Sequence, residues 1–148
     1  MAAYKSIVVG TDGSSTADVA VDRAGAVAGA CDAELLIVAA YGRDAHADAA
    51  VESALGSDAW MVAGYAPAES VVQAAADRAR AAGAKQVETL TVKGSPVDVL
   101  DQVVANARAD LLVVGNVGLN TVSGRILGSV PQSLARRSGV DVLIVHTS

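Results

Sequence analysis

Five short runs of apolar residues recur along the chain, and Ala-rich stretches of helical length separate them. The runs cover Ser6–Gly10, 35–41, 87–92, Leu111–Gly115 and 142–146. Several of them are apolar at consecutive rather than alternating positions, which is typical of parallel strands covered on both faces. This alternation of strands and helices predicts an α/β fold, a three-layer sandwich around a five-stranded parallel sheet.

Helix-capping signals fall between these runs. Ser14 or Ser15 caps a first helix, which we expect to reach about Ala30. Pro67 begins a second helix, and Gly83 ends it. The signals therefore stand where a βαβ arrangement requires helices.

The third helix has the clearest signal. Residues 95–98, Ser-Pro-Val-Asp, combine a capping serine, a proline in the first turn and an acid at the third position. The residues expected to face the sheet are Val97, Leu100, Val104 and Ala107. A fourth helix is predicted from Ser129 to Gly139, with basic residues at the negative end of its dipole.

Composition and charge narrow the class of protein. Of 148 residues, 52% are hydrophobic, only 3% are aromatic and none is Phe, so one core of Val, Leu, Ile and Ala is expected. A net charge of −5 provides no basic field for DNA or a membrane surface, and the single cysteine, Cys31, excludes an internal disulfide. No apolar run is long enough to span a bilayer. We expect a single domain, residues 1–148, of a soluble cytoplasmic protein that binds neither nucleic acid nor membrane.

Glycines follow the fourth apolar run in the spacing Gly-x2-Gly-x9-Gly-Ser, formed by Gly115, Gly118, Gly128 and Ser129. Glycine has no Cβ and adopts positive φ, so backbone amides turn toward an anion, and a serine at a helix start adds its hydroxyl and the free first-turn amides. One interpretation is therefore a phosphate site that needs no lysine. The other is local, with Gly128 and Ser129 beginning a helix and Gly115 ending a strand.

Two of the predicted strands end alike. Residues 8–13 are Val-Val-Gly-Thr-Asp-Gly, and residues 113–118 are Val-Val-Gly-Asn-Val-Gly. In doubly wound sheets, ligands bind beyond the carboxyl ends of two neighbouring strands whose crossovers leave in opposite directions. If these strands are those neighbours, Gly10 and Gly115 floor a crevice, and Asp12 at its rim accepts hydrogen bonds from a ribose or an adenine amino group. The alternative for Asp12 is a local turn with the glycine that follows it.

These motifs resemble those of the universal stress protein family over nearly the whole chain. Besides the spaced glycines, the opening residues 7–14, the Gly-Ser-Pro turn at 94–96 and the closing Val-Leu-Ile-Val-His at 142–146 occur in family order. The resemblance implies a Rossmann-like fold of the adenine nucleotide alpha hydrolase type with strand order 3-2-1-4-5. It also implies a nucleotide in the crevice and a homodimer in which the last strand, residues 141–147, pairs across a two-fold axis.

The resemblance further implies which residues hold the nucleotide. Asp12 matches the position that holds the ribose or the base, and Ala40 matches the backbone position that reads adenine. The spaced glycines and Ser129 match the phosphate loop. There Val117 and Val130 offer backbone groups or cover the sugar, or they are ordinary packing residues. The expected ligand-binding residues are Gly10, Thr11, Asp12, Ala40, Gly115, Asn116, Val117, Gly118, Arg125, Gly128, Ser129 and Val130. No catalytic residue and no metal ligand is expected.

The charge of this loop bears on the identity of the ligand. Asn116 and Val117 replace the small polar and basic residues that many family members carry there, and Arg125 is the one basic residue between positions 115 and 130. A triphosphate needs more compensating charge than a cyclic monophosphate. Residues 115–120 and 124–131 also look like the actinobacterial subgroup of the family that binds cyclic AMP. We therefore favour cyclic AMP over ATP, with no cofactor required and magnesium only if the ligand is ATP.

Other classes of function account for less of the sequence. A slow ATPase is the main alternative, but there is no Gly-x4-Gly-Lys-Ser/Thr loop, and His46 and His146 lie far from the glycine motif in sequence, as structural or solvated residues. A flavodoxin-like carrier would use the hydroxyl-rich residues 11–16, and a phosphoreceiver domain would need an acidic acceptor at Gly115. An interaction module would not need the motif glycines. We predict a protein without enzymatic activity that senses or buffers an adenine nucleotide.

Overall fold

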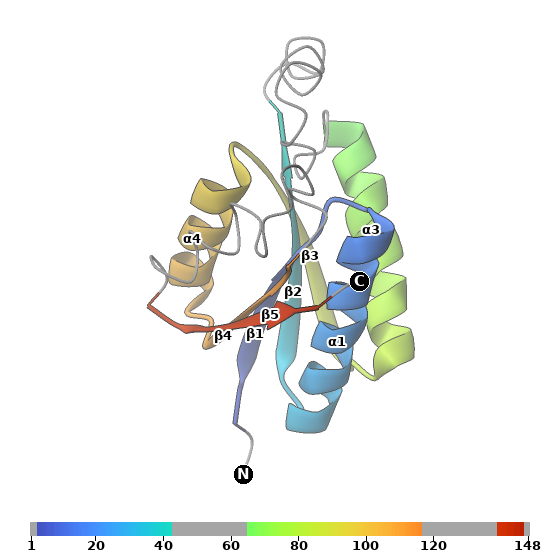
Figure 1. Cartoon of the computed structure of the whole chain (residues 1–148), viewed down its shortest axis with the longest axis vertical. Helices are drawn as coiled ribbons and strands as arrows, with labels where there is room; N and C mark the ends of the chain where they lie inside the picture. Colours follow the sequence, from blue (N-terminus) through green and yellow to red (C-terminus); the bar gives the residue numbers. More distant parts are fainter. Residues whose placement is uncertain (1–2, 43–64, 117–138, 147–148) are drawn as a thin grey trace.

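The computed structural model describes residues 3–42, 65–116 and 139–146. Its centre is a five-stranded parallel sheet in the order β3-β2-β1-β4-β5 (Figure 1). The strands are β1 Ser6–Gly10, β2 Glu34–Tyr41, β3 Gln86–Lys93, β4 Leu111–Gly115 and β5 Asp141–Val145. The predicted fold class and strand order are therefore confirmed.

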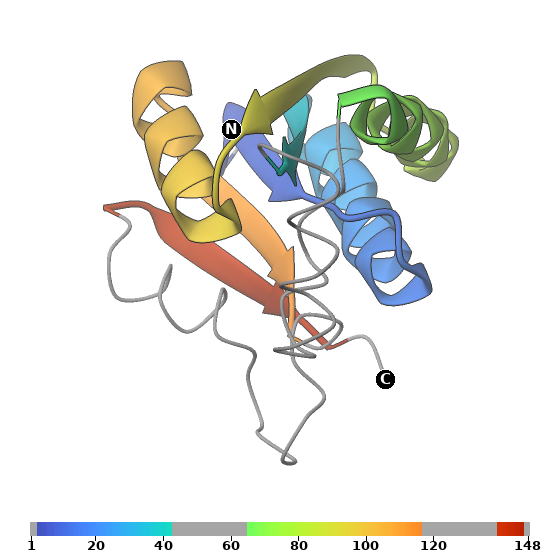
Figure 2. The same cartoon turned by 90° about the horizontal axis from the view of Figure 1, so that it is seen from above.

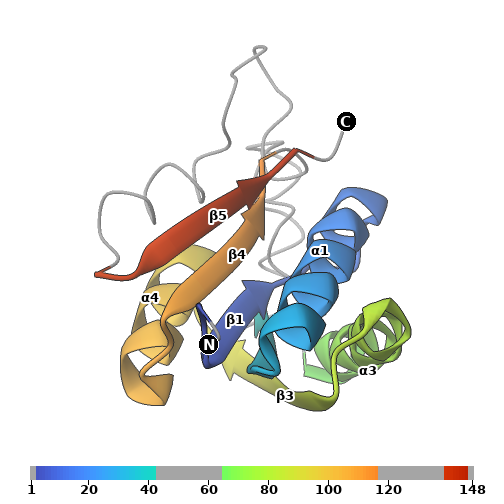
Figure 3. The same cartoon turned by 90° about the horizontal axis from the view of Figure 1, so that it is seen from below.

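Helices cover both faces of this sheet. The helices α1 Ser15–Cys31 and α3 Tyr65–Ala82 lie against one face, and α4 Pro96–Ala107 lies against the other (Figure 2, Figure 3). Successive side chains of a strand point to opposite faces, so Ile7 and Val9 pack under α1 and α3 while Val8 packs under α4. Burial on both faces explains why the central strands are apolar at consecutive positions, and it produces the three predicted layers.

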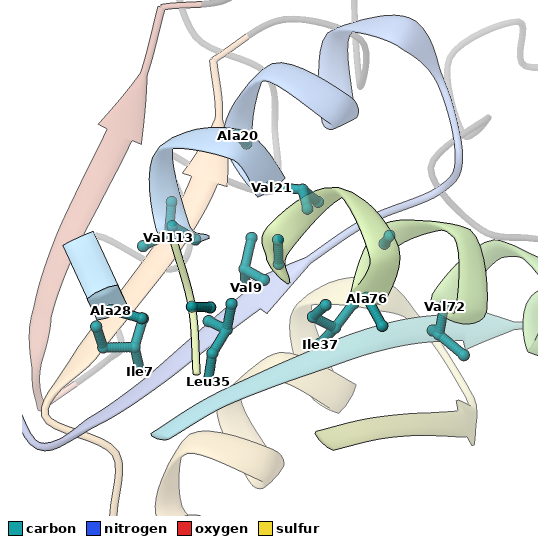
Figure 4. Packing of buried hydrophobic residues seen from close by; sticks show 14 of the residues in the cluster. Ile7, Val9, Ala20, Val21, Ala28, Leu35, Ile37, Val72, Ala76 and Val113 are labelled. Carbon is teal, nitrogen blue, oxygen red and sulfur yellow. The ribbon is translucent and has the colours of Figure 1, made fainter. Parts of the chain in front are cut away.

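The larger apolar cluster lies between the sheet and the pair α1 and α3 (Figure 4). Strand side chains such as Ile7, Leu35 and Ile37 meet helix alanines such as Ala28 and Ala76 there. Because alanine is small, the helices approach the sheet closely, and branched aliphatic side chains fill the layer. This packing matches the core that composition predicts.

Two details of the helices differ from the sequence prediction. The helix α3 begins at Tyr65 rather than at Pro67, because a proline is tolerated throughout a first turn whose amides have no intrahelical partner. In α4 the predicted face is rotated, since Val97 is only half-buried and Ala107, the last helical residue, is exposed. The residues that α4 buries form two adjacent i, i+4 rows, Val99 with Val103 and Leu100 with Val104.

Some predictions fall outside the described residues or stay untested. The predicted fourth helix lies outside them except for its end at Gly139. The single-domain organisation stays a prediction. Within the described part of the chain, no helix is long and apolar enough to cross a membrane.

The end of α4 permits a test of local conformation. Arg108 terminates the helix in the left-handed region, with φ 53° and ψ 44°, and its side chain is exposed. Glycine adopts this conformation without strain, so Arg108→Gly is expected to raise the free energy of unfolding by about 0.5–1 kcal/mol. The control Ala107→Gly places glycine at a helical position and is expected to lower the free energy of unfolding by about 0.5–1 kcal/mol. Urea denaturation measures both, and a loss of stability in both variants would contradict the prediction.

Candidate functional site

The strand order reverses between β1 and β4. From β1 the chain passes through α1 to β2 and through α3 to β3, and it then returns over the other face through α4 to β4, on the opposite side of β1. The carboxyl ends of β1 and β4 therefore lie at the point where ligands bind in doubly wound sheets. We call this place the carboxyl edge and define it by residues 10–14, 40 and 115–116.

Short-range hydrogen bonds build the loop after β1. The side chain of Thr11 is fully buried, and its Oγ1 accepts a hydrogen bond from the amide of Gly13 at 3.1 Å. The Oδ1 atom of Asp12 accepts one from the amide of Ser14 at 2.9 Å. The Oγ atom of Ser14 in turn accepts from the amide of the third residue of α1 at 3.1 Å, so Ser14 rather than Ser15 is the N-cap. The loop and the helix start are thus one bonded unit.

Gly13 fixes this loop against α3. It adopts a φ of +84°, and a Cβ atom added to it would lie 2.9 Å from Cγ2 of Val71. The backbone conformation favours glycine, and the missing Cβ lets the loop approach Val71 of α3. The carboxylate of the neighbouring Asp12 is therefore carried by a loop that packs against α3.

The environment of Asp12 makes its charge costly. Burial raises the pKa of this carboxyl above its ordinary value of 3.8, and hydrogen bonds from Ser14 and the backbone offset the effect only in part. Because Oδ1 of Asp12 accepts from the amide of Ser14, this atom takes part in a local turn, as the alternative interpretation of Asp12 expects. A carboxylate has further lone pairs on Oδ2, which a hydroxyl or amino group of a ligand would satisfy.

Ala40 lies on β2 beyond the end of β1, which stops at Gly10, level with Val38. Backbone groups of a strand alternate between its two neighbours. The carbonyl of Val38 accepts from the amide of Thr11 on the β1 side, and the carbonyl of Tyr41 accepts from the turn after β3 on the other side, each at 3.0 Å. Ala40 therefore turns its N–H and C=O toward the β1 side, at a level where β1 has already ended. Both groups face the carboxyl edge.

The end of β4 is tied to the end of β5. Gly115 pairs with Val145, and the amide of Asn116 donates to the carbonyl of Val145 at 2.9 Å. Asn116 is buried, with 5% of its surface exposed, and its Nδ2 lies 3.2 Å from Nδ1 of His146. The sequence predicts His146 to be a structural or solvated residue of the last strand. In the structure it follows that strand and contacts a candidate ligand residue. Only the register between β4 and β5 reveals this contact.

The predicted ligand residues divide into two groups. Those that the structure brings to the carboxyl edge are Gly10, Thr11, Asp12, Ala40, Gly115 and Asn116. Those outside the described residues are Val117, Gly118, Arg125, Gly128, Ser129 and Val130, and the same holds for His46. Across the described ranges, no group of three or more His, Cys, Asp or Glu side chains is placed to hold a metal ion. The described part of the edge can thus accept and donate hydrogen bonds.

Comparison with known sequences gives one family. The profile described as the universal stress protein family matches residues 3–146. The chain is also 51% identical over 148 residues to the universal stress protein Rv1636 of Mycobacterium tuberculosis strain H37Rv, and the match covers 100% of both chains. The match therefore extends over the whole chain, including the segments that form the carboxyl edge.

Solved structures agree with this result. A universal stress protein crystallised in complex with cAMP is 48% identical, with a TM-score of 0.78, and the match covers 99% of this chain and 100% of that chain. A universal stress protein from Archaeoglobus fulgidus in complex with dAMP is 17% identical, with a TM-score of 0.65 and coverage of 95% and 97%. The second similarity demonstrates a shared fold.

Proposed function

The chain belongs to the universal stress protein family, and on this basis we propose that it binds an adenine nucleotide at the carboxyl edge, with cyclic AMP preferred to ATP. The observation that carries the proposal is the 48% identity, over 99% of this chain, to a universal stress protein in complex with cAMP. The geometry of the edge supports it, because acceptor and backbone groups converge where the strand order reverses.

Each part of the nucleotide has a proposed partner. The carboxylate of Asp12 accepts hydrogen bonds from the ribose or from the adenine amino group. The N–H and C=O of Ala40 complement adenine, whose edge carries a ring-nitrogen acceptor beside an amino donor. Backbone amides bind the phosphate, as in other glycine-rich loops. The residues proposed to line the ribose and phosphate are Gly10, Thr11, Gly115, Asn116, Val117, Gly118, Arg125, Gly128, Ser129 and Val130.

The proposed role is that of a sensor or buffer of the nucleotide in stress signalling, without a chemical step. We place the protein in the cytoplasm and assign it no nucleic acid or membrane partner, in keeping with its net charge of −5. We also propose a homodimer formed through β5. This strand is at one end of the sheet order, and the edge of a terminal strand is a ready template for pairing with another chain.

Calorimetric titration of the nucleotide-stripped protein with cyclic AMP, alone and with saturating ATP and magnesium, tests the proposal. We expect stoichiometric binding of cyclic AMP that ATP barely disturbs, since Arg125 is the one basic residue of the glycine-rich stretch. Binding of ATP without binding of cyclic AMP would contradict the preference and would direct attention to slow hydrolysis. Binding of neither nucleotide would refute the proposed function.

A further inference from the structure

The ends of β4 and β5 are joined by two hydrogen bonds that involve the same residue. Asn116 donates its backbone amide to Val145 at 2.9 Å, and its side-chain Nδ2 lies 3.2 Å from Nδ1 of the next residue, His146. Asn116 is buried, whereas His146 is exposed at the end of the sheet. A solvent-facing ring therefore contacts a buried side chain at the carboxyl edge, 30 positions away along the sequence.

We propose that His146 is a positioning residue for the nucleotide site, which it serves by holding the side chain of Asn116 through an acceptor nitrogen. The inference rests on the proposed function and adds to it a residue that makes no contact with the ligand itself. His146 is not among the twelve expected ligand-binding residues, and it comes directly after β5 rather than in the glycine-rich stretch.

The chemistry of the contact assigns the roles of the two groups. The amide nitrogen of asparagine donates hydrogen bonds and accepts none, so Nδ1 of His146 must present its lone pair, and the ring proton resides on Nε2. With Nδ2 engaged in this way, Oδ1 of Asn116 is directed away from His146. The hydrogen bond thus selects both a ring tautomer and one orientation of the amide.

The location of Asn116 explains why its orientation matters. It is the first residue after β4, at the point where the strand order reverses, and it precedes the spaced glycines Gly118 and Gly128. A side chain that is already held in one orientation loses less conformational entropy when a ligand binds. His146 is therefore expected to raise nucleotide affinity without contributing a contact of its own.

Two substitutions of His146 separate positioning from mere presence of a polar side chain. In His146→Asn, the Oδ1 atom takes the place of Nδ1 in the ring and still accepts a hydrogen bond. In His146→Gln, the acceptor lies one bond farther from the backbone, near the place of Nε2. By calorimetry with cyclic AMP we expect the Gln variant to lose affinity by about 3- to 10-fold and the Asn variant to stay within about twofold of wild type. The side chain is exposed in the single chain but adjoins the strand proposed to form the dimer, so thermal unfolding and size-exclusion chromatography should show both variants folded and in the oligomeric state of wild type.

Nitrogen-15 NMR of the ligand-free protein provides a readout that does not depend on nucleotide. The Nε2–H tautomer of His146 is expected, and the side-chain amide resonances of Asn116 should move in the Gln variant but remain near wild type in the Asn variant. A proton on Nδ1, or equal affinities for cyclic AMP in the two variants, would overturn the proposal. If wild type bound neither cyclic AMP nor ATP, the proposed function would fail, and the tautomer and the Asn116 resonances would still decide whether His146 positions Asn116.

Discussion

Replacing Asp12 with asparagine is expected to stabilise the ligand-free protein at neutral pH and to weaken its binding of cyclic AMP by about 10- to 100-fold. Burial raises the pKa of this carboxyl, so its ionised form is costly in the folded state. Asparagine retains an acceptor for the amide of Ser14, 2.9 Å away in wild type, and removes the charge. The ligand then loses a hydrogen bond to a charged acceptor, which is stronger than one to a neutral acceptor.

The gain in stability has a defined dependence on pH. The folded-state pKa of Asp12 is raised above the ordinary 3.8, so between these two values the folded protein binds the proton and the unfolded protein does not. The contribution of Asp12 to the free energy of unfolding is therefore greatest at low pH, and it falls as the pH rises from about 3.8 through the folded-state pKa. Chemical denaturation at several pH values tests this dependence. The difference in the free energy of unfolding between Asp12→Asn and wild type should increase as the pH rises through this range and become small below it.

Asp18 provides a matched control for the loss of binding. It lies in the first turn of α1, with its Oδ2 at 3.9 Å from Nη1 of Arg78, and it is not part of the loop after β1. Asp18→Asn removes an equal charge near the same end of the sheet and is expected to leave the affinity for cyclic AMP within about twofold, because the charge of Asp18 lies near that of Arg78 and, being partly exposed, is screened by solvent and salt. Equal losses of affinity in the two variants would show that the effect comes from the overall electrostatic field of the protein. An unchanged affinity in Asp12→Asn would show that Asp12 does not contact the ligand.

Two analogues identify the group of the ligand that Asp12 holds. 2′-Deoxy cyclic AMP lacks the ribose hydroxyl, and purine riboside cyclic monophosphate lacks the adenine amino group but keeps the ring-nitrogen acceptor proposed to face Ala40. The analogue without the recognised group should bind wild type more weakly than cyclic AMP, and Asp12→Asn should discriminate much less between the two ligands. If wild type distinguished neither analogue from cyclic AMP, the role proposed for Asp12 would be wrong.

Gly29→Ala is expected to lower the free energy of unfolding by about 1–3 kcal/mol, although the same change inside most helices raises it. Gly29 lies in α1, and a Cβ atom there would collide with the backbone of Gly83, lying 2.8 Å from its carbonyl carbon and closer still to its oxygen. Backbone atoms yield less easily than the end of a side chain. Gly83 directly follows α3, so α1 and α3 would have to separate, and the layer of alanines between these helices and the sheet would pack less tightly.

Gly139→Ala is the control for Gly29→Ala. Among the described residues, a Cβ atom at Gly139 would meet nothing within 4 Å, and Gly139 is not in the left-handed region, so stability should change by no more than about 0.5 kcal/mol. Urea denaturation compares the two variants with wild type. A Gly29→Ala protein as stable as Gly139→Ala would show that α1 and α3 yield at this contact without cost. Gly25 offers a second test, because its Cβ would lie 2.7 Å from the carbonyl oxygen of Ala79.

The elements of the fold were predictable because their signals are local. Consecutive apolar residues identify β1 and β4 to the residue, and Ser14 marks the start of α1 by a hydrogen bond within four positions. The sequence predictions were less accurate where a local rule allows several positions for a helix start or a buried face. A first-turn proline did not locate the start of α3 at Tyr65, and apolar spacing alone placed Ala107 on the wrong face of α4.

The candidate site was predictable in part for the same reason. Asp12 and Gly13 stand out in sequence because they form a short polar segment directly after an apolar strand. The recurrence of Val-Val-Gly indicated two related strand ends. The order of the strands came from the family resemblance rather than from the residues themselves, since nothing local specifies which strands are neighbours. The contact of Asn116 with His146 carried no sequence signal.

By itself, the sequence determined the α/β class, the places of the strands and helices, the alanine-rich core and the polar strand end at Asp12, because each depends on neighbours within a few residues. Only the tertiary structure decided that Ala40 turns its backbone past the end of β1, that Gly29 touches Gly83, and that His146 reaches Asn116. These contacts depend on strand register and helix docking. Both are set by packing between segments that are distant in the chain, so no local pattern encodes them.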